Sequence, residues 1–157
     1  HNVVWDKARQ ILWSAGQAEL YSLQYNFDCA RPDLIIKDSI PIPGTEAHDL
    51  FPVYGKDELW LTNTTHVFRF SPGTRKLTQA NTTYQQNIKS ISSGPEGYPV
   101  IIILPKEKWW TDEVIDTTGK SIFREPGLNW FGTEIAQVGN LMNIILKDRW
   151  ISRLVIL

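Results

Sequence analysis

Two histidines stand at equivalent places in the sequence, and imidazole is the side chain best suited to bind a metal or move a proton near neutral pH. His1 and His48 are 47 positions apart, and each precedes a short polar side chain, Asn2 or Asp49. Two converging imidazoles could hold a divalent metal ion, and Asp49 could orient His48 or act as a base. The alternative is structural, because a repeated histidine can also hydrogen-bond a neighbouring unit. The sequence therefore predicts a metal site at His1 and His48 and catalytic candidates at His48 and Asp49.

Tryptophan is unusually frequent, with seven among 157 residues. Trp13 and Trp60 are also 47 positions apart, so we expect both to pack between repeated units. Three other tryptophans have no such counterpart. An exposed indole beside a carboxylate can stack on a sugar while the carboxylate binds its hydroxyl groups. The predicted ligand-binding set, with core and turn positions as the alternative, is Trp109, Trp110, Asp112 and Trp130.

These residues belong to an internal repeat. Residues 1–23 align without a gap to residues 48–70, so that Leu12 and Trp13 fall on Leu59 and Trp60. The segments are rich in β-branched and aromatic residues, and turn residues recur every 8–12 positions, which favours short strands over helices. A period of this length with four short strands is typical of a β-propeller blade.

The predicted fold class is therefore all-β, with about three four-stranded propeller blades. The blade units cover approximately residues 1–45, 46–86 and 87–131, within a single domain or fragment spanning residues 1–157. The irregular tail, residues 132–157, has apolar residues at helical spacing between Thr133 and Lys147, although the same residues could form strands in a propeller. We expect a short C-terminal helix there, followed by a strand over residues 150–157.

Residues 1 to about 130 resemble bacterial β-propeller proteins of unassigned function. The segments that carry the resemblance are HNVVWD with Leu12-Trp13, AHDL followed by ELW, and WWTDEV. Similarity is weaker to TolB-like propellers and to propeller-type oligogalacturonate lyases. These lyases hold a metal with histidine and glutamine ligands in the channel, so the resemblance implies a precedent for the metal site, and the groups imply rings of six or seven blades.

Composition narrows the function. The net charge of −1 argues against a nucleic-acid partner, and no apolar run is long enough for a membrane span. The single Cys29 excludes a disulfide scaffold, which fits a reduced compartment or an exported bacterial protein. Propellers usually have 4–8 blades, so the chain needs further blades or other chains to close a ring, or it leaves blade edges exposed.

Besides a purely structural scaffold for partners, two functions remain open from the sequence. The first is a propeller that binds a ligand, a glycan or a protein, on the face of the central channel. The alternative is a carbohydrate-active enzyme, a polysaccharide lyase or glycoside hydrolase, in which His1, His48 and Asp49 surround a divalent metal. A propeller fold by itself does not choose between them, because the same fold hosts many unrelated activities.

Overall fold

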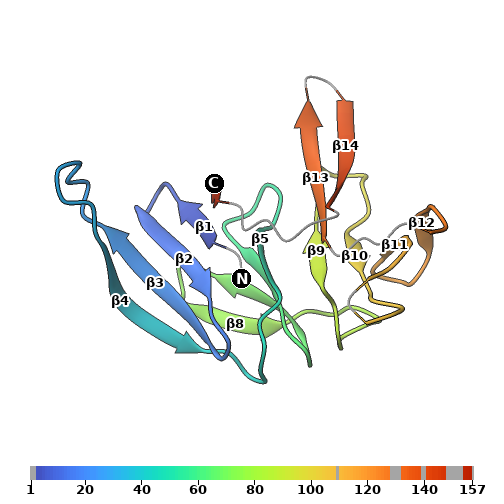
Figure 1. Ribbon diagram of the computed structural model, residues 1–157, viewed down its shortest axis with the longest axis horizontal. Coiled ribbons are helices and arrows are strands. Elements are labelled where there is room, and N and C mark those ends of the chain that lie inside the picture. Colours follow the sequence, from blue (N-terminus) through green and yellow to red (C-terminus); the bar gives the residue numbers. More distant parts are fainter. Residues whose placement is uncertain (1–2, 109, 128–131, 139–140, 148–153, 157) are drawn as a thin grey trace.

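The computed structural model describes residues 3–108, 110–127, 132–138, 141–147 and 154–156. These residues form strands and connecting turns, arranged as three four-stranded antiparallel sheets that stand side by side like the blades of a propeller (Figure 1). In each blade the four strands lie side by side in chain order. The first blade consists of β1 (Val3–Asp6), β2 (Ile11–Ala15), β3 (Glu19–Tyr25) and β4 (Leu34–Pro41).

The other two blades repeat this arrangement. The second blade consists of β5 (Asp49–Pro52), β6 (Leu59–Thr62), β7 (Val67–Ser71) and β8 (Lys76–Gln79). The third blade consists of β9 (Ser90–Ser92), β10 (Ile101–Ile103), β11 (Glu113–Asp116) and β12 (Ser121–Arg124). The first strands β1, β5 and β9 contact one another in succession, while β4, β8 and β12 lie at the outer edges (Figure 1). The innermost strands thus face the place where a propeller has its channel.

The sequence repeat is also a repeat of strand register. In the first blade Trp13 pairs with Val4 on one side and Ser22 on the other. In the second blade Trp60 pairs with Phe51 and Arg69, which are the residues 47 positions further along. The gap-free alignment therefore places the same positions opposite each other in both sheets.

The expected helix between Thr133 and Lys147 is wrong. These residues form a β-hairpin of β13 (Gly132–Val138) and β14 (Leu141–Lys147), which pair antiparallel along their whole length. Short apolar runs fit helical and extended periods alike, and here β13 lies against β9 and β10, where an extended chain continues the series of blades. The strand expected over residues 150–157 is present as β15 (Leu154–Ile156), which pairs parallel with β1.

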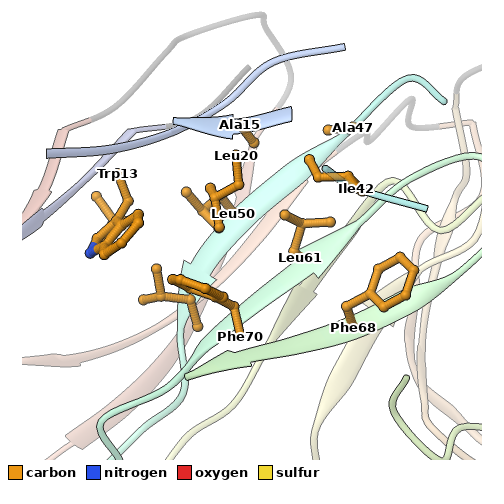
Figure 2. Packing of buried hydrophobic residues seen from close by; sticks show 11 residues of the cluster. Trp13, Ala15, Leu20, Ile42, Ala47, Leu50, Leu61, Phe68 and Phe70 are labelled. Atoms are coloured by element: carbon orange, nitrogen blue, oxygen red, sulfur yellow. The ribbon is translucent and has the colours of Figure 1, made fainter. Parts of the chain in front are cut away.

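The core lies between the blades. The cluster between the first and second blades includes Trp13, Leu20, Leu61 and Phe70, and Figure 2 shows the Trp13 ring directed at Phe70. The two ring centroids are 4.8 Å apart with planes inclined by 69°, an edge-to-face arrangement that aromatic pairs prefer. A second cluster, between the second and third blades, contains Trp60, Ile88, Ile91, Ile102 and Ile115. The expectation that both tryptophans pack between neighbouring blades is confirmed.

The burial of the second strands reflects the position of each blade. All four residues of β6 are buried, because the second blade has a neighbour on both faces. In β2 only Trp13 and Ala15 are buried, and Ile11, Leu12 and Ser14 are partly exposed. The described part of the chain contains no helix long and apolar enough to cross a membrane.

Candidate functional site

A pocket of about 640 Å³ opens between the second and third blades, at the end where the first strand of each blade turns into the second. One side is the β5–β6 turn, residues 53–58, and the other is the β9–β10 turn, residues 93–100. Tyr54 and Tyr98 both line this turn pocket, and their side chains are 47% and 52% exposed. Lys56 and Glu96 contribute one charge of each sign. The turn pocket thus combines aromatic rings with polar groups, the usual composition of a small-molecule site.

Short turns hold the two tyrosines in place. In the β5–β6 turn, the Val53 N–H donates to the Glu58 carbonyl oxygen at 2.9 Å, and Gly55 adopts a φ of +67°. This left-handed conformation favours glycine, because other side chains are strained there. In the β9–β10 turn, the Tyr98 N–H donates to the Pro95 carbonyl oxygen at 3.1 Å. Both tyrosines therefore sit on closed turns rather than on long loops.

Hydrogen bonds across the pocket tie the two blades together. The Ser93 hydroxyl oxygen accepts the Trp60 indole N–H at 3.1 Å and the Tyr54 backbone N–H at 3.0 Å. The Arg69 guanidinium lies 5.0 Å above the Trp60 ring and forms an ion pair with Glu58 at 2.5 Å. Trp60 thus belongs to the core between the blades and also lines the turn pocket.

His48 lies at the opposite end of β5, between the second and third blades. Lys89 Nζ donates to His48 Nδ1 over 3.2 Å, and the Lys89 side chain is buried. Burial, reinforced by the Lys89 charge, lowers the pKa of His48 to about 4. Burial also lowers the pKa of Lys89. His48 is therefore uncharged at neutral pH, with an ammonium group beside one ring nitrogen.

Asp49 is buried next to His48, at the start of β5. Its carboxylate oxygen Oδ2 accepts the backbone N–H of Ile91, in the first strand of the next blade, at 3.1 Å. A carboxylate that accepts a backbone N–H from an adjacent blade fixes the position of that blade. This contact gives Asp49 a structural role between the blades, whereas its role as a base stays a prediction.

Asp112 lies in a group of charged side chains before β11. Its carboxylate pairs with Lys106 Nζ at 2.9 Å and with Arg124 Nε at 3.3 Å, and the hydrogen bond from Lys106 lowers the pKa of Asp112. Trp110 is partly buried, and in a tight turn its carbonyl oxygen accepts the Lys106 and Glu107 backbone N–H groups while its own N–H donates to the Glu107 carbonyl oxygen. These ion pairs compete with any sugar hydroxyl for the Asp112 carboxylate, so binding by Trp110 and Asp112 stays a prediction.

Three predicted site residues, His1, Trp109 and Trp130, lie outside the described residues. Among the residues that the structure describes, no group of three or more His, Cys, Asp and Glu side chains could hold a metal ion. The two-histidine site at His1 and His48 accordingly stays a prediction.

A family model matches residues 1–149, nearly the whole chain. The chain belongs to the family of unknown function DUF6528. The search of curated proteins found no match. Membership of this family therefore assigns no activity and no ligand to the chain.

Among solved structures, the chain is similar to the WD40 domain of Pan2 from Neurospora crassa. The TM-score is 0.54 at 12% sequence identity, and the match covers 86% of this chain and 40% of that chain. At this identity the likeness concerns the fold alone. It agrees with the blade architecture, and this DUF6528 chain spans less than half the length of that structure.

The turn pocket is not predicted by the sequence. The segment Gly94-Pro95-Glu96-Gly97 is recognisable as a turn, but the sequence pattern does not show that it lies beside residues 53–58. A usable signal exists, since each of the two turns combines a tyrosine with glycine at the end of a first strand. Tyr54 and Tyr98 lie in turns and are exposed. Turn residues do not follow the alternation that directs every second side chain of a strand to one face of the sheet.

Proposed function

We propose that this propeller-like chain is a glycan-binding module and that the turn pocket is its binding site. The observation that carries the proposal is the presence of two solvent-exposed tyrosine rings, Tyr54 and Tyr98, on adjacent blades around one pocket. A sugar ring presents apolar C–H faces to aromatic rings and hydroxyl groups to polar side chains. Lys56 and Glu96 supply a donor and an acceptor for those hydroxyl groups.

The shape of the site favours a glycan over a folded protein as the ligand. Small-molecule pockets have volumes of roughly 300–1,000 Å³, a range that includes this one. A stable protein interface instead buries about 800 Å² on each partner over a broad surface. The sequence predicts a ligand on the channel face, which the inner strands form, whereas the turn pocket lies at the ends of these strands.

The test is a glycan-array screen of the full chain, followed by calorimetric titration of the best oligosaccharide. Removing one stacking ring costs about 0.5–1.5 kcal/mol, so Tyr54→Ala and Tyr98→Ala should each weaken binding about 2- to 10-fold. The matched control is Tyr84→Ala, because Tyr84 is also exposed but does not line the turn pocket. The proposal fails if no glycan binds, or if all three variants bind as the wild type does.

The enzymatic alternative uses His1, His48 and Asp49 with a divalent metal. The low pKa of His48 supports this alternative in one respect, because an uncharged imidazole can accept a proton or coordinate a metal at neutral pH. Elemental analysis of the purified chain and of a His48→Ala variant would test it: a stoichiometric metal lost in the variant is the expected result. As part of this alternative, we propose that the protein is bacterial and exported, and that it is related to TolB-like propellers and oligogalacturonate lyases.

A further inference from the structure

Ser93 is a buried polar residue in the wall of the turn pocket. It follows β9 directly and is only 8% exposed. Its hydroxyl oxygen accepts two hydrogen bonds, from the Tyr54 backbone N–H at 3.0 Å and from the Trp60 indole N–H at 3.1 Å. Both donors come from the second blade, so the position of this hydroxyl group is fixed from two sides.

These two bonds determine what the Ser93 hydroxyl can offer a ligand. A hydroxyl group has one hydrogen to donate and two lone pairs that accept. Both lone pairs of Ser93 Oγ already receive N–H donors, so the group can only donate. Among the residues that the structure describes, no acceptor receives this hydrogen. The Ser93 hydroxyl is therefore a positioned hydrogen-bond donor for a ligand in the turn pocket.

The pocket wall that contains Ser93 is otherwise largely apolar. Val53 and Trp60 are 5% and 6% exposed, and Val100 is partly buried. All three line the turn pocket and belong to the apolar cluster between the second and third blades. A ligand group that matches this wall needs one acceptor atom for the hydroxyl and a small apolar part for the valines.

Two acceptor groups are common on sugars besides the hydroxyl group, namely carboxylates and acetamido groups. A carboxylate fits this wall poorly, because placing a charge against apolar side chains costs solvation free energy. The Arg69 guanidinium, which also lines the pocket, is already paired with Glu58 at 2.5 Å. An acetamido group carries an uncharged carbonyl oxygen and a methyl group next to each other, which is the combination that the wall requires.

We propose that the turn pocket recognises 2-acetamido sugars, with the Ser93 hydroxyl donating to the acetamido carbonyl oxygen and the acetamido methyl group lying against Val53 and Val100. Glu96, which also lines the pocket, can accept the acetamide N–H. This inference rests on the proposed glycan binding, and it adds the class of sugar and the residue that selects it.

The experiment compares three simple glycosides in NMR titrations of the full chain. Methyl β-N-acetylglucosaminide and methyl β-glucoside differ only at C2, where an acetamido group replaces a hydroxyl group, while methyl β-glucuronide carries a carboxylate instead. The N-acetylglucosaminide should bind about tenfold more tightly than the glucoside, because it gains a hydrogen bond and buries a methyl group. Saturation transfer from the protein should be strongest at the acetyl methyl protons.

Substitutions at Ser93 separate recognition from a structural role. Ser93→Ala should reduce the preference for the acetamido sugar to about twofold, whereas Ser93→Thr keeps a hydroxyl group and should retain the preference. If Ser93 acted only by holding Tyr54, Ser93→Ala would weaken the binding of both glycosides by the same factor. Because Ser93→Ala also removes two bonds between blades, Val100→Thr is a second test that keeps them. It places a hydroxyl group against the acetyl methyl and should lower the preference about threefold.

The possible failures are distinguishable. If the chain binds no glycan, the proposed function fails and this inference fails with it. If glycans bind but the N-acetylglucosaminide binds no more tightly than the glucoside, or the glucuronide binds most tightly, only the acetamido assignment is overturned. A preference that both Ser93→Ala and Val100→Thr leave unchanged would overturn the role of this wall.

Discussion

The two junctions between blades use equivalent tryptophans in different surroundings. Trp13, between the first and second blades, is 1% exposed, and its indole N–H lies 3.5 Å from Asp6 in its own blade. Trp60, between the second and third blades, is 6% exposed and donates its N–H across the junction to Ser93. Trp13 thus keeps its N–H contact within its own blade, whereas Trp60 hydrogen-bonds to the neighbouring blade.

The turn ends of the two junctions also differ. At the first junction, Arg9 from the β1–β2 turn binds both carboxylate oxygens of Asp57, at 2.8 and 2.5 Å, and this lowers the pKa of Asp57. At the second junction the corresponding turns border the turn pocket. With a salt bridge between turns in one place and a pocket in the other, a repeated scaffold forms different surfaces without changing its strands.

The largest effect is expected from Trp13→Ala. Removing a fully buried aromatic side chain leaves a cavity and typically costs about 3–5 kcal/mol of unfolding free energy. Trp60→Ala should cost less, because Trp60 already borders the turn pocket. Chemical denaturation of both variants measures the difference, and Trp13→Phe serves as the control that keeps a ring against Phe70. Equal losses for Trp13→Ala and Trp60→Ala would show that the two junctions are packed alike.

An intermediate effect is expected from Ser93→Ala. This change leaves the Trp60 indole N–H and the Tyr54 backbone N–H without their acceptor, at a cost of about 1–3 kcal/mol. Trp60→Phe removes one of those donors, so the double variant should lose less than the sum of the single variants. Strict additivity in denaturation experiments would mean that this hydrogen bond does not join the blades.

The smallest effect at pH 7 is expected from His48→Gln, because His48 is already uncharged there. The pKa of His48 is lowered from 6.5 to about 4, so between these values the unfolded chain binds more protons than the folded chain. Stability should therefore fall as the pH decreases through this window. Thermal unfolding between pH 7 and 5 should show a shallower decline for His48→Gln than for the wild type. Parallel declines would contradict the assigned burial of His48.

Most of the strand positions could be predicted from the sequence, whereas the candidate site could not. Strands near Ile11–Ala15 and Ile101–Ile103 follow from β-branched and aromatic runs bounded by turns, which is local information. The apolar spacing of residues 133–147 predicts a helix but suits a pair of strands equally, and the contact of β13 with β9 decides between the two structures. Tyr54 and Tyr98 are 44 positions apart, and only the stacking of the blades brings their turns to one pocket.

The sequence by itself determined the repeat, and with it the register of the first two blades and the role of Trp13 and Trp60. It could do so because alternation along a strand and a gap-free period fix which residues face a neighbouring blade. Only the tertiary structure decided that Asp49 hydrogen-bonds the next blade, that Lys89 lies beside His48, and that a pocket opens between two turns. These contacts depend on how far apart neighbouring blades sit, and no spacing along a single strand encodes that distance.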